Sequence, residues 1–295
     1  WIDRLSYSRD ASVYRMVPEA VARPRNNKEI EILFDYSRNN KIPITFRTAG
    51  TSLSGQSVTN GILVEIKDYW NRFKVFDEGR KIMLQPGVNG GTANKILARY
   101  HRKIGPDPAS LNAACIGGIV SNNSSGMVCG TEYNSYNTLD SIRFMLSNGH
   151  VYDSGVKGDS EKFKYNEPKI FKVLLDIKET ILNNKSLYNK IINKYRIKNT
   201  IGYSMNSFID YSDPLDIFSH LLVGSEGTLA FISSVTLNTI SDFEHKATGL
   251  IIYNNSRSAC NFVTDFKDSG ATAIEFLDDR SLKTAVNIHK PPYNS

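Results

Sequence analysis

Apolar and polar residues alternate along the N-terminal part of the chain in a way that predicts a helix followed by short strands. Apolar residues recur at helical spacing between residues 30 and 36, behind Asn26 and Asn27, either of which can cap a helix. Two apolar runs rich in β-branched residues follow, at residues 42–46 and 62–66. We therefore expect one helix and then two short strands here.

Two hairpins and a pair of helices are predicted further along. Short apolar runs at residues 73–76 and 81–85 flank a polar turn. Residues 142–152 form two apolar segments around Asn148-Gly149, which is a strong signal for a type I′ hairpin turn. Apolar positions at helical spacing then predict a helical pair over residues 168–195.

The pattern in the C-terminal part of the chain predicts that a second structural unit begins there. Residues 221–232 form an apolar run, a turn of small residues and a second apolar run, which indicates two strands. After a boundary near Phe243, the pattern predicts a strand at 249–253, a helix at 256–267 and a strand at 272–277. A further helix is just beginning after that strand, so we expect the start of an α/β unit.

Composition places the chain among globular proteins without a membrane span. It has 295 residues, of which 40% are hydrophobic and 22% charged, and no apolar run approaches the roughly 20 residues that cross a bilayer. The length predicts more than one domain. Both ends look cut, so we expect a piece of a longer protein.

The distribution of charge and the positions of the cysteines and histidines argue against a nucleic-acid-binding protein and a metal site. The net charge is +6 and the pI about 9.0, but Lys and Arg are spread along the chain, which argues against a nucleic-acid partner. The richest basic cluster, Lys185 to Lys198, predicts a helix with a solvated basic face. The three cysteines and five histidines show no metal-ligand spacing, so we expect no metal site. We expect the histidines to lie at the surface or at strand ends, and the protein to be cytoplasmic. An anionic substrate and association with a membrane surface stay open.

Three segments of small residues carry the candidate chemistry. They are Phe46 to Ser57, Gly105 to Gly126 and Gly224 to Leu229. The first follows a predicted strand and offers backbone N–H groups and hydroxyls, which suit a phosphate. It matches neither a P-loop nor a Rossmann fingerprint. Gly, Ser and Asn in the second and third segments let a planar or charged ligand approach the backbone.

Taken together, these segments resemble the FAD-binding half of the p-cresol methylhydroxylase and vanillyl-alcohol oxidase superfamily, in its FAD-linked oxidase branch. That branch includes D-lactate dehydrogenases, D-2-hydroxyglutarate dehydrogenases and the flavin subunit of glycolate oxidase. The resemblance implies an α+β fold with two FAD-binding subdomains, residues 1–70 and 71–242. It also implies that residues 243–295 begin an α/β cap domain that contacts the substrate.

The resemblance also implies which residues contact FAD. The loop at Thr51 would hold the pyrophosphate, and because this position is not the His that anchors flavin covalently in some members, we expect non-covalent FAD. The implied cofactor contacts are Thr48, Ala49, Gly50, Thr51, Ser52, Pro108, Ser110, Gly117, Gly118, Asn122, Ser125, Gly126, Thr131, Glu226, Gly227 and Ile232. The lone thiol of Cys129 is expected to pack in the core or at the flavin edge.

The implied activity is oxidation of a D-2-hydroxy acid, with electrons passed from the flavin to a downstream acceptor. In long bacterial members of the branch this acceptor is an iron–sulfur segment that leads to a membrane quinone pathway; no such cluster motif lies in this chain. No catalytic base matches, so the catalytic residues stay unknown. Two alternatives stay open: a flavin-binding subunit without catalysis, and a flavin-free protein that binds a nucleotide or sugar phosphate.

Overall fold

The first predicted helix forms where its capping residue places it. The computed structural model describes residues 1–288, with residues 285–288 described by their backbone alone. Helix α2 (Asn27–Asn40) begins after Asn26, whose side chain accepts a hydrogen bond from the Glu29 amide at 3.1 Å. It ends at Lys41, which takes the left-handed conformation. The predicted helix is therefore confirmed.

A small parallel sheet lies beside this helix. Its strands are β1 (Ala20–Ala22), β3 (Ile62–Glu65) and β2 (Ile44–Arg47), in that order across the sheet. Every residue of β3 is buried, as expected for a central parallel strand. Strand β2 runs directly into the first small-residue segment, so the sheet fixes where that segment begins.

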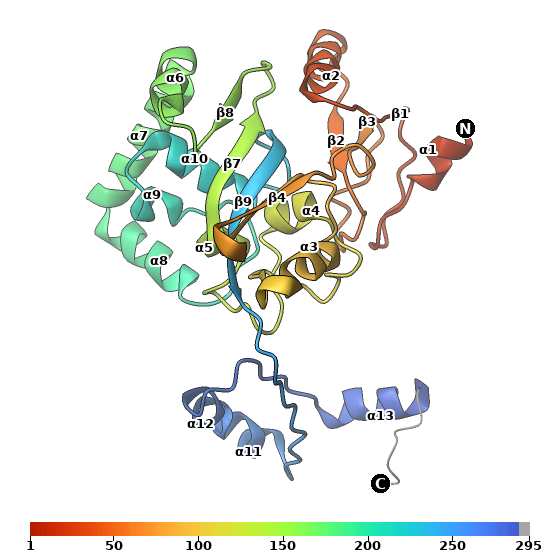
Figure 1. The fold of residues 1–295 in the computed structure, drawn as a ribbon, viewed down its shortest axis with the longest axis vertical. Helices are drawn as coiled ribbons and strands as arrows, with labels where there is room; N and C mark the ends of the chain where they lie inside the picture. Colours follow the sequence, from red (N-terminus) through yellow and green to blue (C-terminus); the bar gives the residue numbers. More distant parts are fainter. Residues whose placement is uncertain (289–295) are drawn as a thin grey trace. The chain divides into compact units, whose positions relative to one another are not determined.

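A larger antiparallel sheet forms the centre of residues 1–244 (Figure 1). Its strands follow the order β4-β5-β9-β7-β8, and β6 pairs with the far end of β9. Both predicted hairpins are confirmed, as β4 with β5 and as β7 with β8. The predicted type I′ turn at Asn148-Gly149 was wrong, because that turn needs positive φ at both residues and only Gly149 has it, at +88°. The strand bounds are β4 (Phe73–Phe76), β5 (Lys81–Leu84), β6 (Arg102–Ile104), β7 (Leu139–Met145), β8 (Val151–Asp153) and β9 (Phe231–Ser241).

Helices flank the larger sheet, and α6 to α10 gather on one side of it (Figure 1). The predicted helical pair is confirmed as α7 (Pro168–Asn183) and α8 (Lys185–Tyr195). The other elements of this part are α1 (Ile2–Ser6), η1 (Asp77–Gly79), α3 (Gly90–Leu97), η2 (Ala98–Tyr100), α4 (Ile116–Asn122), α5 (Ser135–Thr138), α6 (Asp159–Asn166), α9 (Ser207–Asp210) and α10 (Pro214–Leu222).

The two sheets share one apolar contact region. Phe231, the first residue of β9, lies with its ring centroid 4.9 Å from Phe46 of β2 and 5.0 Å from Trp70. Phe231 and Met145 of the large sheet belong to the same buried cluster as Ile30 of α2. The first and third small-residue segments are attached to these two strands, so this packing brings them together.

The prediction of a strand at residues 221–223 was wrong. These residues form the end of α10, which begins at Pro214 after Asp213 caps the Leu215 amide at 2.7 Å. Every residue of this helix except Asp216 is buried. The polar residues Asp216, Ser219 and His220 share one face of this helix, but Leu221, Leu222 and Val223 follow as an uninterrupted apolar run. A short apolar run cannot be told from a buried strand by its pattern alone.

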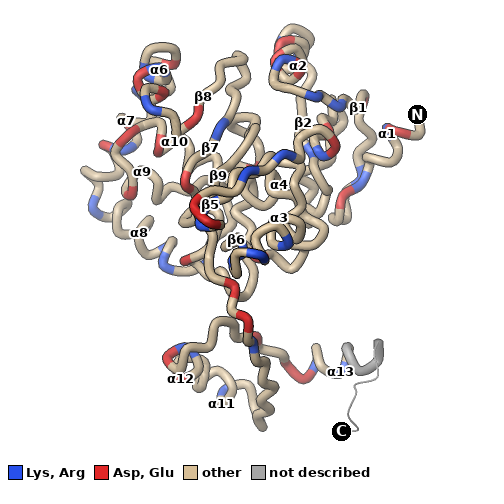
Figure 2. The backbone as a smooth tube through the Cα atoms, viewed as in Figure 1, with Lys and Arg blue, Asp and Glu red and all other residues tan. Residues whose placement is uncertain are grey.

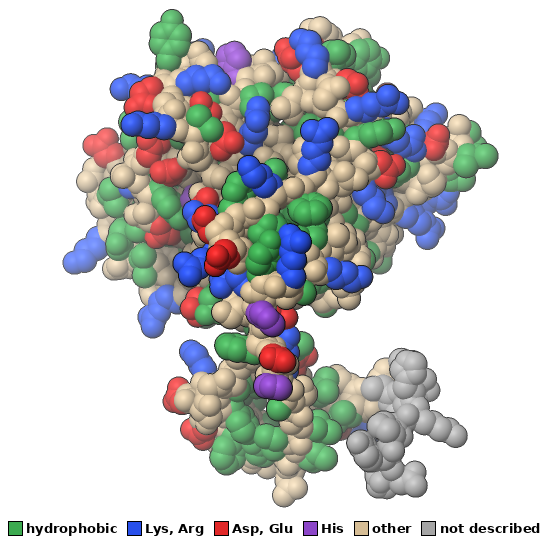
Figure 3. Space-filling view, viewed as in Figure 1, with side chains coloured by type: hydrophobic (Ala, Val, Ile, Leu, Met, Phe, Trp, Pro, Cys, Tyr) green, Lys and Arg blue, Asp and Glu red, His purple; other side chains and the backbone are tan. Residues whose placement is uncertain are grey.

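The chain separates into two compact units, residues 1–244 and 245–295. In the second unit the predicted helix is divided into α11 (Ser256–Asn261) and α12 (Val263–Asp268), and α13 (Asp279–Ile288) follows. The strands predicted at 249–253 and 272–277 are absent from the described part of this unit. An extended run becomes a strand only when another strand pairs with it. Apolar side chains remain on the surface of this unit (Figure 3), with Ile252 86% exposed. The finer domain boundaries at residues 70 and 242 stay predictions.

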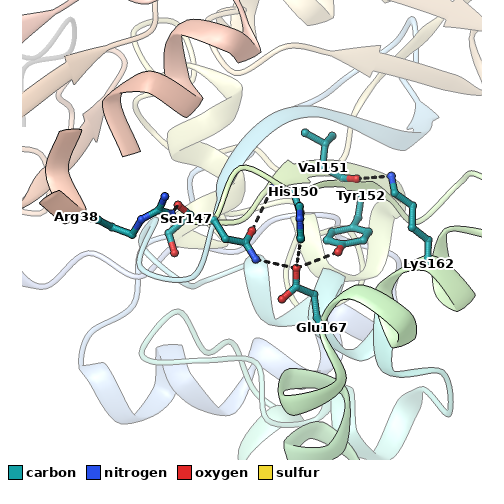
Figure 4. A network of polar contacts seen from close by, with 8 residues as sticks. Arg38, Ser147, His150, Val151, Tyr152, Lys162 and Glu167 are labelled. Atoms are coloured by element: carbon teal, nitrogen blue, oxygen red, sulfur yellow. Dashed lines mark hydrogen bonds and ion pairs between the residues drawn. The ribbon is translucent and has the colours of Figure 1, made fainter. Parts of the chain in front are cut away.

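A buried carboxylate fastens the β7–β8 hairpin to the helices beside it (Figure 4). Glu167, just before α7, accepts hydrogen bonds from Asn148 at 2.9 Å, His150 at 2.6 Å and the Tyr152 hydroxyl at 3.0 Å. Arg38 of α2 donates to the Ser147 carbonyl of the same hairpin. Burial would raise the pKa of Glu167, but the three hydrogen bonds outweigh it and lower that pKa.

Charged residues of both signs are interspersed around the first unit (Figure 2). No helix in the part of the chain that the structure describes is long and apolar enough to cross a membrane.

Candidate functional site

The three small-residue segments line one pocket with a volume of about 610 Å³. This volume lies within the range of about 300–1,000 Å³ typical of small-molecule and cofactor sites. Most of the predicted contact residues line it, namely Thr48, Gly50, Thr51, Ser52, Pro108, Ser110, Gly117, Gly118, Asn122, Ser125, Glu226, Gly227 and Ile232. The fold therefore gathers residues that lie far apart in the sequence around one cavity.

The first small-residue segment is the loop after β2, and it forms one wall of the pocket with backbone N–H groups that make no hydrogen bond in the described structure. Gly50 has φ +69°, which turns the chain sharply and favours glycine. Within the described residues, the N–H groups of Gly50, Thr51 and Ser52 have no acceptor. Successive free amides around a left-handed residue form a concave site for an anion. This loop can therefore hold a phosphate through its backbone.

A cation without an acidic partner lies beneath this loop. The half-buried guanidinium of Arg47 donates to the carbonyl oxygens of Tyr7 at 3.2 Å and Ser57 at 3.4 Å. No carboxylate among the described residues lies within 4 Å of it, and burial lowers its pKa despite the more distant acids. Arg47 also lines the pocket. Its charge is thus available to an anionic ligand. The sequence placed Arg47 within the first small-residue segment but did not assign it a contact with the cofactor.

The second wall is helix α4, whose two glycines have different surroundings. A Cβ atom on Gly117 would lie 2.7 Å from the Pro86 Cβ, so this glycine permits close packing within the protein. A Cβ atom on Gly118 would meet only the Thr48 hydroxyl, at 3.6 Å, and Gly118 is exposed to the pocket. The absent side chain of Gly118 therefore leaves room for a ligand.

Glu226 joins the walls to one another. The Asn122 side chain at the end of α4 donates to its carboxylate at 2.6 Å, and Gln56 of the first loop also hydrogen-bonds to it. Glu226 has φ +53°, an uncommon conformation for a residue with a side chain. Burial raises the pKa of its carboxyl, although the two hydrogen bonds oppose the change. The hydrogen bonds hold the three segments in a fixed arrangement.

Two further lining residues come from a segment that the sequence did not single out. Lys198 and Thr200 follow α8 and line the pocket, and the Lys198 ammonium donates to the Ser125 carbonyl at 2.8 Å. The basic cluster at 185–198 forms a helix as predicted, but its last lysine lies beyond the helix and reaches the pocket. No local sequence signal indicates that the chain after α8 comes back to the pocket.

Three predicted contact residues lie outside the pocket lining. Ala49 hydrogen-bonds through its backbone to the buried Cys115 thiol, behind the loop. Gly126 donates to the Asp107 carboxylate at 3.0 Å, and Thr131 lines a separate cavity of about 40 Å³. Their role toward a cofactor stays a prediction.

None of the cysteines and histidines among residues 1–288 belongs to the pocket lining. Cys129 is buried and packs against the Gly126 amide at 3.3 Å. His220 was expected at the surface or at a strand end, but it is buried in α10, where it stacks on Tyr211. His289 lies outside the described residues. Among the described residues, no cluster of His, Cys, Asp and Glu could hold a metal ion.

Comparison with known sequences agrees with this geometry. Residues 18–155 match the model of a family described as FAD binding domain. The chain is 25% identical over 298 residues to a D-2-hydroxyglutarate dehydrogenase from Pantoea ananatis (strain AJ13355), which covers 97% of this chain and 28% of that protein. It is 28% identical over 288 residues to the glycolate oxidase subunit GlcD of Bacillus subtilis (strain 168), which covers 95% of this chain and 50% of GlcD. The chain thus spans half or less of the length of these relatives.

Solved structures share the fold. An alkyldihydroxyacetonephosphate synthase aligns with a TM-score of 0.52 and 16% identity, over 81% of this chain and 36% of that one. A glucooligosaccharide oxidase from Acremonium strictum, described with a 6-S-cysteinyl, 8α-N1-histidyl FAD, aligns with a TM-score of 0.51 and 16% identity, over 79% and 38%. Together the comparisons confirm the predicted fold and the predicted relationship to FAD-linked oxidases.

Proposed function

From this relationship to FAD-linked oxidases, we propose that the chain is the FAD-binding portion of a flavin-dependent enzyme that oxidises a D-2-hydroxy acid. The substrate class is that of D-lactate, D-2-hydroxyglutarate or glycolate, which follows the names of the relatives. The observation that carries the proposal is the pocket wall with three free amides above the unpaired Arg47. A dinucleotide pyrophosphate supplies the negative charge that this wall lacks.

The residues of the pocket fit FAD by their chemistry. The free amides of Gly50, Thr51 and Ser52 would hold the pyrophosphate, with Arg47 balancing its charge. The open face at Gly118 leaves space along the cofactor. In the described structure the Ser125 hydroxyl is buried at the pocket without a hydrogen-bond partner, which leaves it free for a polar group of the ligand.

Bound FAD would supply the acceptor for the two electrons that leave the hydroxy acid as it becomes a 2-keto acid. The chain's own contribution is to bind and orient the cofactor. The charged groups among the described lining residues are Arg47, Lys198 and Glu226, and none of them is a free base of the kind that takes a hydroxyl proton. We therefore assign these residues to cofactor binding and leave the catalytic residues unassigned.

We also propose that FAD is held without a covalent bond. Attachment of the kind described for the glucooligosaccharide oxidase uses a His and a Cys. The described residues that line this pocket include neither, and Thr51 stands in the pyrophosphate loop. Acid precipitation of the flavin-loaded chain should therefore release all of the flavin into the supernatant, whereas yellow precipitated protein would contradict this assignment.

The test of the cofactor is an absorption spectrum with mass analysis of the released ligand. The purified chain should bind FAD with quenching of flavin fluorescence, and should bind riboflavin far more weakly because riboflavin lacks phosphate. A chain that does not bind FAD would refute the proposal and favour the flavin-free alternative.

The substrate class is tested with a panel of acids and a reducible dye. For the full-length enzyme, dye reduction by D-lactate, D-2-hydroxyglutarate or glycolate, but not by L-lactate or L-2-hydroxyglutarate, is the expected result. Transfer of electrons to an iron–sulfur segment or a quinone pathway is the corresponding proposal for the physiological acceptor.

A second candidate is a flavin-binding subunit without its own substrate site. Two observations favour it: the pocket has no assigned base among the described residues, and GlcD is named as a subunit. Full FAD binding by the full-length protein without dye reduction by any acid of the panel would support this candidate over the first.

A further inference from the structure

The segment before residue 18 contacts the candidate phosphate loop, although it lies outside the matched FAD binding domain. The Ala11 amide donates to the Gly50 carbonyl at 3.1 Å, and Ala11 lines the pocket. The Tyr7 carbonyl accepts a hydrogen bond from Arg47. The N-terminal segment therefore belongs physically to the same site.

A chain of three side chains links this segment to the pocket. The Ser52 hydroxyl donates to the Ser57 hydroxyl at 3.1 Å, and the Ser57 hydroxyl donates to an Asp10 carboxylate oxygen at 3.1 Å. The other Asp10 oxygen accepts from the Ser12 amide at 2.9 Å. Burial would raise the pKa of Asp10, but the hydrogen bonds from Ser12 and Ser57 outweigh it and lower that pKa, so Asp10 is ionised at neutral pH.

The direction of these hydrogen bonds is fixed by chemistry. An ionised carboxylate accepts hydrogen bonds and cannot donate them, so the Ser57 proton must point to Asp10. The Ser57 oxygen then accepts the Ser52 proton. The Ser52 oxygen, which lines the pocket, is left with lone pairs and without a proton to give.

We propose that Asp10 is a positioning residue that makes Ser52 a hydrogen-bond acceptor in the cofactor site. The Ser52 hydroxyl then binds a hydroxyl or amino donor of the ligand, such as a sugar hydroxyl, and the phosphates bind to the backbone amides and Arg47. This corrects the expectation that the loop serines serve as phosphate donors. It rests on the proposed function, because the ligand donor is taken to be part of FAD.

The informative variant is Asp10→Asn, because it keeps the shape of the side chain. Ser12 and Ser57 each hydrogen-bond to Asp10 through the backbone amide as well as the side chain, and the Ser12 amide contact, at 2.9 Å, is shorter than the Ser57 hydroxyl contact. With the amide oxygen of Asn kept on the shorter contact, the NH₂ group faces Ser57, loses the bond from the Ser57 amide and donates to the Ser57 hydroxyl. The whole chain then reverses, and Ser52 would donate into the pocket. We expect FAD affinity to fall about three- to tenfold in this variant, the loss of one neutral hydrogen bond. Ser52→Ala should show a similar loss.

Three further binding measurements test whether Asp10 acts through the Ser52 oxygen. The double variant Asp10→Asn/Ser52→Ala should bind FAD no more weakly than either single variant, because both act through the same oxygen. Inorganic pyrophosphate in its ionised form has no donor group, so it should bind the Asp10→Asn chain at least as tightly as the wild type. Asp3→Asn removes the same charge from the same segment and should leave FAD affinity unchanged, because Asp3 pairs with Arg23 at an exposed site.

The outcomes separate the two proposals. No FAD binding by the wild-type chain overturns both. Wild-type binding that is unchanged or tighter in Asp10→Asn, or additive losses in the double variant, overturns the role of Asp10 alone. If Asp10→Asn does not fold, Ser57→Ala interrupts the same chain at its middle, and undiminished FAD binding by that variant overturns the inference.

Discussion

Replacing Gly118 by alanine should stabilise the protein while weakening cofactor binding. Gly118 lies inside α4 with ordinary helical backbone angles, and a Cβ atom there has only the Thr48 hydroxyl nearby, at 3.6 Å. Alanine favours a helix interior by about 0.8–1.0 kcal/mol relative to glycine. The added methyl group fits the protein without a clash and projects into the pocket.

The two effects have different magnitudes and different assays. For a unit of this size, a gain of about 1 kcal/mol raises Tm by about 2–4 °C, which a thermal unfolding scan of the ligand-free chain measures. A methyl group in a filled site costs about 1–3 kcal/mol, so FAD affinity should fall roughly five- to 150-fold in a fluorescence titration. Stabilisation with loss of binding marks a residue that faces the ligand.

The neighbouring glycine provides the comparison. Gly117→Ala places a methyl group 2.7 Å from the Pro86 Cβ, so it should lower Tm whether or not FAD is present. If Gly118→Ala binds FAD as tightly as the wild type, the cofactor does not pass along α4, and the assignment of this wall is wrong.

Three other predictions concern charge and hydrogen bonding. Burial lowers the pKa of His220, whose Nε2 atom is buried without a partner in the described structure. The unfolded chain therefore binds a proton at this histidine more readily than the folded chain, so the free energy of unfolding should fall as pH drops below about 6.5. His220→Phe should remove this pH dependence, as measured by urea titrations at several pH values. Lys198→Met should weaken FAD binding about three- to tenfold and reduce its salt dependence, with Lys194→Met as an unaffected control. Glu167→Ala removes the acceptor shared by Asn148, His150 and the buried Tyr152 hydroxyl and should cost about 2–3 kcal/mol in urea unfolding, whereas a loss below about 0.5 kcal/mol would contradict the role of this carboxylate.

Sequence reasoning predicted the walls of the pocket because their residue types carry local information. Gly50 marks a left-handed turn, and of the two glycines of α4, Gly117 marks a close packing contact and Gly118 a surface without a side chain. The flanking strands and the hairpins were predicted for the same reason, since their patterns span a few residues. The strand predicted at residues 221–223 was wrong because a few consecutive apolar residues at the end of a helix have the same local pattern as a buried strand.

The residues that sequence reasoning missed are those whose role depends on distant parts of the chain. Lys198 belongs to a basic cluster that looks solvated, and its contact with the Ser125 carbonyl spans 73 positions. Asp10 is separated by 47 positions from Ser57, and no residue near Asp10 indicates an anion site. Arg47 ends a strand, and its missing acidic partner becomes visible only when every neighbour is placed.

The charge balance of the pocket explains why these long-range contacts matter. Among the described lining residues, Arg47 and Lys198 bring two positive charges, and Glu226 brings a carboxyl whose pKa burial raises. A pyrophosphate carries about two negative charges, so it neutralises the two cations. Asp10 adds a negative charge close by, which a site for phosphate alone would not favour. Its place beside the pocket suits a ligand that also presents hydroxyl donors, and a dinucleotide presents both groups together.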